Sequence, residues 1–242
     1  MCIRDRWQTK FELPYAELTD LGVPFYVVLG NHDYGGDGAG IEVWKGAHQI
    51  DYSARSATWT MPDEYYTFVR EHVTFVGLDT NAIFWGVGLG QQKSWVDDTL
   101  LAATTPWRIV FGHHPYISNG KHGNAGNYEG LPSWVPIASG VNVRRFFDES
   151  LCNGPVDVYI SGHDHNRQWL PEQCGIQHFV SGAAAKTTGL EGRGNVTSFE
   201  DDSEPGFLYV EISGDTLRGR FHGEDGRVQF EQTMTRPSVG TR

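Results

Sequence analysis

Three segments of the chain share one pattern, in which an apolar run ends in a glycine followed by side chains able to bind a metal ion. The segments are VPFYVVLGNHD, WRIVFGHHP and VDVYISGHDH, with the polar ends Asn31-His32-Asp33, His113-His114 and His163-Asp164-His165. Five of the ten histidines lie in these three ends. Imidazole is a good ligand for zinc, iron and manganese, and an amide oxygen suits harder cations. The pattern therefore predicts a metal site.

A single histidine after a strand is usually a hydrogen-bonded structural residue, so the prediction depends on the three ends coming together. Ligands of open α/β sheets bind beyond the carboxyl ends of the strands, and the glycines allow the backbone to turn sharply there. His163 and His165 would share a face on an extended segment, or serve different ions on a loop. Asp164, between them, would then point away.

The rest of the chain indicates the elements that would position these side chains. Strands are predicted at 23–29, 73–78, 107–111, 156–161, 167–170, 177–181, 207–212, 216–222 and 228–232, and helices at 11–21, 92–103 and 141–151. Loops are predicted at 34–40, 115–139 and 189–205. Alternating strands and helices followed by strand-rich sequence indicate one domain with an α/β layered sandwich. The loop 115–139 is long enough to suggest a functional role.

Charge and composition limit the possible partners. The chain has 242 residues and a net charge of −11, which argues against nucleic acid and anionic membranes as partners. Its sequence has no apolar run of the roughly 18 residues that a membrane span needs. A small phosphorylated substrate remains compatible, because bound metal ions can reverse the local charge. Nothing in the sequence indicates the oligomeric state.

Cys152 and Cys174 flank predicted strands and are expected at the same end of the sheet. They could form a disulfide, which would imply an oxidising compartment, or remain two separate buried thiols.

The motifs GNHD, GHHP and GHDH resemble those of the calcineurin-like metallophosphoesterases, and most closely the small purple acid phosphatases of the tartrate-resistant type. The resemblance extends from about residue 7 to residue 212 and includes QQKSWVDDTLLAATTPWRIVFGHHPYIS. It implies a four-layer αββα sandwich, described as α/β or α+β, with a dinuclear metal centre at the strand ends. It also implies that Asn31, His113 and His163 bind a divalent metal ion, Fe2+, Zn2+ or Mn2+, and that His165 binds Fe3+.

The resemblance assigns further roles. It implies that His32 and His122 are catalytic, His122 by binding phosphate or protonating the leaving group. Lys121 stands where related enzymes often have a glutamate, which leaves the acid partner of His122 open. Side chains expected to contact substrate or to support the ligands are His114, Asp33, Asp79 and Asp164. For Asp79, capping of a turn is the alternative.

The reaction implied is metal-dependent hydrolysis of phosphate monoesters. A phosphodiesterase of the same superfamily and a catalytically inactive metal- or phosphate-binding relative are the alternatives.

The family's first two motifs, Asp-x-His and Gly-Asp-x-x-Tyr, do not occur before GNHD. The opening residues MCIRDR resemble a translated sequencing adapter. We therefore expect residues 1–6 to be non-native and residues 7–242 to be the C-terminal three-quarters of a metallophosphoesterase domain. The intact parent is expected to be secreted or periplasmic, and this chain alone to be weakly active or inactive.

Overall fold

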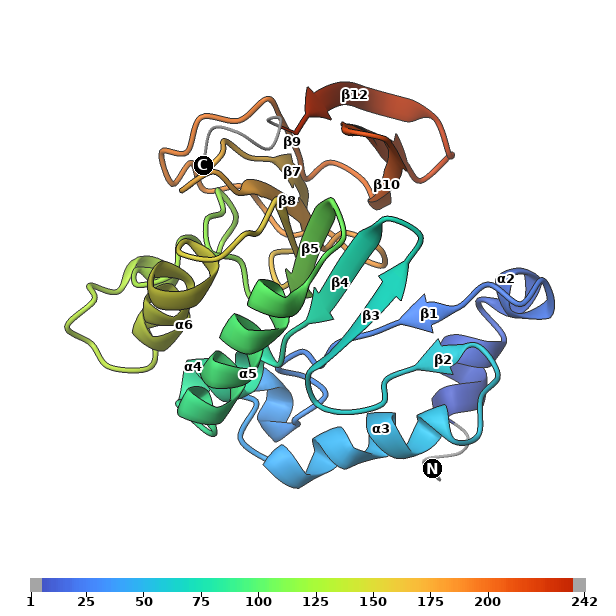
Figure 1. The fold of residues 1–242 in the computed structure, drawn as a ribbon, viewed down its shortest axis with the longest axis horizontal. Coiled ribbons are helices and arrows are strands. Elements are labelled where there is room, and N and C mark those ends of the chain that lie inside the picture. The colour runs from blue at the N-terminus through green and yellow to red at the C-terminus, as the bar shows by residue number, and fades with distance from the viewer. Residues whose placement is uncertain (1–5, 237–242) are drawn as a thin grey trace.

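A seven-stranded sheet lies between a layer of helices and a three-stranded sheet in the computed structural model, which describes residues 6–236 (Figure 1). The order of the strands in the large sheet is β3-β4-β5-β6-β8-β7-β9. Their bounds are β3 Tyr66–Arg70, β4 Val73–Gly77, β5 Trp107–Gly112, β6 Val158–Ser161, β7 Arg167–Trp169, β8 Gln177–Ser181 and β9 Phe199–Asp201.

Strands β4, β5, β6 and β8 run parallel to one another. Their sequences are largely apolar along their length, as in VTFVG and WRIVFG, because both faces of a parallel sheet are covered. The crossovers between them contain α4 (Thr80–Trp85), α5 (Leu89–Ala102) and α6 (Val141–Phe146), which continues as η5 (Phe147–Leu151). The parallel arrangement places the ends of β5 and β6, and the histidines that follow, at the same edge of the sheet.

Each face of the large sheet has its own apolar core. On one face, Val76, Val110 and Tyr159 pack against residues of α4, α5 and α6. On the other face, Trp107 and Trp169 pack against the antiparallel strands β10 (Gly206–Ser213), β11 (Thr216–Gly223) and β12 (Val228–Thr235). These two cores hold the edge where β5 and β6 end in place from both sides.

The N-terminal part forms a smaller unit beside β3 (Figure 1). It contains η1 (Gln8–Glu12), α2 (Ala16–Asp20), η2 (Gly36–Gly38), η3 (Val43–Gly46), α3 (Ala47–Ser53) and the parallel pair β1 (Phe25–Tyr26) and β2 (Trp59–Thr60). An aromatic cluster, in which the Trp7 and Tyr52 rings stack 3.9 Å apart, joins η1 to α3. The GNHD segment follows β1.

The predicted class, a layered mixed α/β fold, is confirmed, and most predicted elements from residue 73 onward are present. The predicted loop 115–139 contains one short helix, η4 (Tyr128–Gly130). The helix predicted at 11–21 was wrong, because Pro14 and its neighbours divide it into η1 and α2. The strand predicted at 23–29 is paired only over Phe25–Tyr26, because β2, its partner, has two residues. Helices α3 and α4 and strands β2, β3 and β9 were not predicted. Residues 1–5 of the predicted non-native segment lie outside the described residues.

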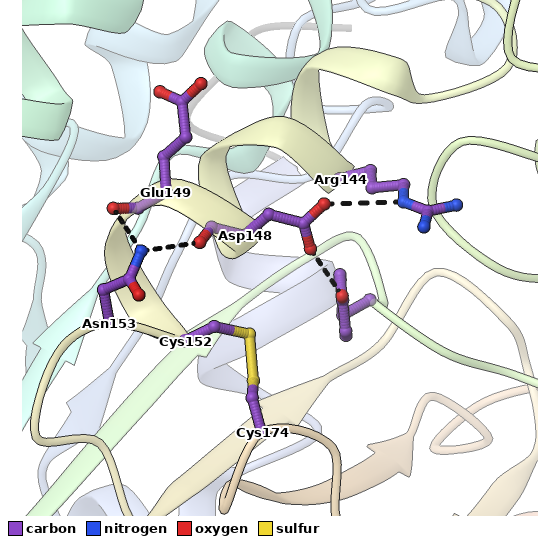
Figure 2. The surroundings of a disulfide bond; sticks show 7 residues. Arg144, Asp148, Glu149, Cys152, Asn153 and Cys174 are labelled. Carbon is purple, nitrogen blue, oxygen red and sulfur yellow. Dashed lines mark hydrogen bonds and ion pairs between the residues drawn. A yellow bond between two sulfur atoms is a disulfide. The ribbon is translucent and has the colours of Figure 1, made fainter.

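Cys152 and Cys174 form a disulfide, with their Cα atoms 5.4 Å apart (Figure 2). Cys152 directly follows η5, and Cys174 lies in the turn before β8, so the bond ties the end of the crossover helix to the sheet. Figure 2 also shows the Asn153 amide donating to the carbonyl oxygen of Asp148 at 2.9 Å. Of the two alternatives, the disulfide is therefore the one found.

No helix among the described residues is long and apolar enough to cross a membrane.

Candidate metal centre

Three donor atoms from three separate segments meet at the edge of the large sheet. Oδ1 of Asn31 lies 2.7 Å from Nε2 of His113, and Nδ1 of His163 lies 2.9 Å from the same atom. His113 directly follows β5, and His163 comes two residues after β6. The structure thus brings together the three side chains that the sequence predicted for one ion.

Neighbouring groups fix the orientation of these donors. Nδ2 of Asn31 donates to the carbonyl oxygen of Gly38 at 2.6 Å, which turns Oδ1 toward His113. A Cβ atom at Gly30 would lie 2.8 Å from Nδ1 of His113, so only glycine lets this backbone pass so close to the ring. His163 has a φ of +63°, a conformation that non-glycine residues seldom adopt and that is often found at functional sites.

Both imidazoles are neutral in their surroundings. Burial lowers the pKa of His113 to about 3, with a further contribution from the charges of His122, His165 and His32. Burial and the neighbouring histidines also hold the pKa of His163 well below its ordinary value. Neutral imidazole is the form that binds metal ions.

The donor set fits a cation better than it fits hydrogen bonding alone. A neutral His113 ring can offer one proton from Nε2, which cannot serve both Asn31 and His163. A cation would satisfy the lone pairs of all three atoms. Amide oxygen with two imidazoles suits a borderline divalent ion. This cluster contains no carboxylate, so the ligands would not cancel the charge of a bound ion.

His113, His114 and His163 form a second possible set of three metal ligands, and their donor atoms lie within 4.8 Å of one another. The hydrogen bonds of Thr80 argue against ligation by His114. Oγ1 of Thr80 accepts hydrogen bonds from the backbone N–H groups of His113 and His114, at 3.1 and 2.9 Å, and lies 3.0 Å from Nδ1 of His114. A hydroxyl has two lone pairs and one proton, so the proton goes to Nδ1. Nε2 of His114 then carries hydrogen and is a donor.

His122 lies over the donor cluster of Asn31, His113 and His163 and has an acidic partner. Its ring stacks on that of His163 with centroids 3.9 Å apart, and its Nδ1 makes a short contact with Oε1 of Glu129. The backbone N–H of Glu129 also donates to the carbonyl oxygen of His122, at 2.9 Å. The acid partner left open by Lys121 is therefore Glu129, seven residues along the chain. Sequence reasoning did not find it, because the pairing depends on the turn between the two residues.

Asp164 supports the position of His122. Its Oδ1 accepts the backbone N–H of His122 at 2.8 Å, and its Oδ2 accepts the hydroxyl of Ser118 at 2.5 Å. The side chain is fully buried, and its two oxygens accept from Ser118 and His122 and not from the three donor residues, in line with the expectation that it points away.

Two further predicted histidines lie outside the three-donor cluster. His165 is half-buried, and its Nδ1 is buried without a hydrogen-bond partner among the described residues. His32 is exposed, and its ring packs on Gly38, where a Cβ would lie 2.6 Å from Cε1. Both are near enough to contribute to the lowered pKa of His113.

Asp33 and Asp79 have local roles in the structure. Asp33 accepts the N–H of Gly30 at 2.8 Å and the Gln49 amide at 2.9 Å, which closes the GNHD turn. Asp79 caps α4 and accepts the Tyr34 hydroxyl at 2.5 Å, while burial raises its pKa to about 6. The capping alternative therefore describes Asp79, and the expectation that it orients a ligand histidine is not what these contacts show.

A cavity of about 510 Å³ opens beside the cluster. Asn31, His114, His122, Glu129 and His163 line its polar end. This volume is in the range of small-molecule sites.

Comparison with known proteins identifies the family of this chain. The sequence model of the calcineurin-like phosphoesterases matches residues 2–167. The chain is 27% identical to human tartrate-resistant acid phosphatase type 5 over 260 aligned positions, covering 96% of this chain and 73% of the relative. It is 28% identical to purple acid phosphatase 4 of Arabidopsis thaliana over 244 positions, covering 89% and 65%.

Two solved structures share the fold. One is GAP50, described as the anchor in the inner membrane complex of Plasmodium, with a TM-score of 0.68 and 22% identity over 95% of this chain and 71% of the other. The second is a dimetal phosphatase from Danio rerio, with a TM-score of 0.59 and 16% identity over 96% and 78%. The family match and the acid phosphatase relatives support metal-dependent hydrolysis of phosphoric esters. The chain belongs to the calcineurin-like phosphoesterase family.

Proposed function

We propose that this protein hydrolyses phosphate monoesters at a dinuclear metal centre. The observation that carries the proposal is the meeting of Asn31 Oδ1, His113 Nε2 and His163 Nδ1, with successive contacts of 2.7 and 2.9 Å. Membership of a phosphoesterase family and similarity to acid phosphatases support it.

In this proposal the metal ions, His114, His122 and Glu129 have separate roles. Bound metal ions would supply an activated water molecule and neutralise charge on the phosphoryl group. His114, with its hydrogen on Nε2, donates to a phosphoryl oxygen. His122 is placed to pass a proton to the departing alcohol, and the Glu129 carboxylate fixes the ring by accepting from Nδ1.

His165 is the residue we assign to the second ion. Its unpartnered Nδ1 shows an imidazole whose hydrogen-bonding capacity is not used by the described residues. In this proposal the pair of ions is Fe3+ with Fe2+, Zn2+ or Mn2+.

A metal-binding protein without catalytic activity is the second candidate. Among residues 6–236, the converging donors form one three-atom cluster, and His165 stands outside it. A single occupied site would bind phosphate without turning it over, or would act weakly.

We also propose that the protein works in an oxidising compartment, outside the cell or in a periplasm. The disulfide between Cys152 and Cys174 supports this location, because such bonds are rare in reducing cytosol.

The test is phosphate release by metal-free protein supplemented with Zn2+, Mn2+ or iron, using 4-nitrophenyl phosphate and bis(4-nitrophenyl) phosphate. We expect faster hydrolysis of the monoester. His163→Gln should abolish both metal binding and turnover, whereas His48→Gln, at an exposed position, should retain them. Faster hydrolysis of the diester would indicate a phosphodiesterase, and metal binding without turnover would favour the non-catalytic candidate.

A further inference from the structure

We propose that the cavity beside the donor cluster selects phosphate monoesters of apolar or aromatic alcohols. The inference rests on the proposed function, since it names the substrate class of that site. It is carried by a wall of the cavity, here called the apolar wall, which consists of Phe84, Trp85, Leu131, Pro136, Ile137 and Ala138.

The cavity has two chemically different sides. Asn31, His114, His122 and His163 stand where a phosphoryl group would bind, and the apolar wall lines much of the remaining space. A monoester placed with its phosphoryl group at the histidines would direct its organic group along this wall. Pockets of this kind use a few polar groups to fix orientation and apolar surface for affinity.

The α4 part of the wall is held firmly. The Phe84 ring lies parallel to that of His114, with centroids 5.4 Å apart and an interplanar angle of 5°. The Asn142 amide donates to the carbonyl oxygen of Phe84 at 3.0 Å. Nε1 of Trp85 donates to the carbonyl oxygen of Ala39 at 3.1 Å, so its polar atom is satisfied and its ring remains to pack. The wall is therefore largely formed before any ligand binds.

The loop that completes the wall is also fixed by hydrogen bonds. The Ser139 hydroxyl donates to the carbonyl oxygen of Val135 at 2.8 Å, and the Asn127 amide donates to that of Leu131 at 2.8 Å. Ile137 has a φ of +63°, which is unfavourable for a β-branched residue. Its side chain nevertheless lines the cavity, and strained residues of this kind cluster at ligand sites.

Charge excludes the main competing substrates. None of the described residues that line the cavity is a lysine or an arginine, and Glu129 places a carboxylate at its edge. A second phosphate, as in a nucleoside diphosphate, would find no lysine or arginine among the described residues of this cavity. An uncharged apolar group needs no such partner.

Binding of non-hydrolysable analogues tests the inference independently of catalysis. We would measure 3-phenylpropylphosphonate and propylphosphonate by calorimetry in Zn2+-supplemented buffer. Burial of a phenyl ring predicts binding tighter by roughly 10-fold or more. Turnover of the matching phosphates should show the same preference, since both leaving alcohols are primary and similarly acidic. Equal affinities would overturn the inference. A binding preference without turnover would support it while contradicting the proposed phosphatase activity.

Variants locate the preference on the wall. Leu131→Gln with Ile137→Asn should reduce the affinity ratio to about 3-fold or less; asparagine tolerates the positive φ at position 137. Trp134→Ser is the matched control, because Trp134 lies in the same loop, is 80% exposed and does not line the cavity. An unchanged ratio in the double variant would show that the apolar group binds elsewhere.

Discussion

The stability of this protein should fall in acid, in part because of His178, a buried histidine away from the donor cluster of Asn31, His113 and His163. His178 lies on β8, is 2% exposed and has no hydrogen-bond partner for either ring nitrogen among the described residues. The rings of Tyr116 and Tyr159 lie 5.5 and 5.9 Å from it, but their hydroxyls already donate to Asp148 and to the backbone of His114. Burial accordingly lowers the pKa of His178 to about 3.

The sign of the effect follows from proton binding. Between pH 6.5 and about 3 the unfolded chain binds a proton at this histidine and the folded chain does not. Acid therefore favours unfolding, and this contribution is absent well above pH 6.5. At pH 4.5, two units below the unfolded pKa, the loss is about 2.7 kcal/mol relative to pH 8. In a domain of this size such a loss lowers the melting temperature by about 5–10 °C.

The perturbation is His178→Leu, which replaces the ring by an apolar side chain of similar size. We would measure urea unfolding by tryptophan fluorescence at pH 8 and pH 4.5, with a chelator present so that metal binding adds no pH dependence. The variant should lose about 2.7 kcal/mol less stability than the wild type between the two pH values. It should be as stable at pH 8 or slightly more so, because no hydrogen bond is lost. His48→Gln, at an exposed site, serves as the control. Parallel pH dependence in wild type and His178→Leu would refute the reasoning.

Three further predictions concern the site and its support. Glu129→Gln should lower kcat by about 10- to 100-fold with little change in KM, because His122 loses its charged partner; steady-state kinetics with an alkyl phosphate would show this, and an unchanged kcat would remove Glu129 from the mechanism. Gly30→Ala should weaken Zn2+ binding by about 10-fold or more in a chelator competition, because its Cβ would meet an imidazole donor at 2.8 Å, whereas Gly90→Ala, with open space around it, should bind as the wild type does. Cys152→Ser should lower the free energy of unfolding by about 3 kcal/mol, since the disulfide closes a loop with a sequence separation of 22, and a denaturant titration that detects no loss would show that the bond contributes little.

The central part of the fold was predictable because its signals are local. Strands such as β5 carry near-continuous apolar runs, and α5 buries Gln92, Val96 and Leu100, which are four residues apart and lie on one face of a helix. The N-terminal part was predicted poorly because its elements depend on neighbours. The apolar run 23–29 has strong strand character, yet pairing over Phe25–Tyr26 alone reflects the length of β2. Short helix α4 depends on the Asp79 cap, a signal that could have been found in the sequence.

The candidate metal ligands were predictable from strand ends, but their supporting contacts were not. Asn31, His113 and His163 each follow an apolar run and a glycine. The parallel pairing of β5 and β6 brings His113 and His163 together, whereas Asn31 follows β1, which lies outside that sheet. Glu129 and Thr80 have no such signal. Their roles follow from a turn with a left-handed residue and from the start of α4, and these became visible only in three dimensions.

Burial of histidine affects both metal binding and stability in this protein. At the cluster, burial keeps His113 and His163 unprotonated in acid, so protons compete weakly with a metal ion for their lone pairs. The ligands are also uncharged, and in a chain with a net charge of −11 they leave the positive charge of the ion available to phosphate. At His178 the same desolvation has no ligand to compensate it, so acid costs stability there. The disulfide at Cys174, four residues before His178, ties down the strand that carries this histidine.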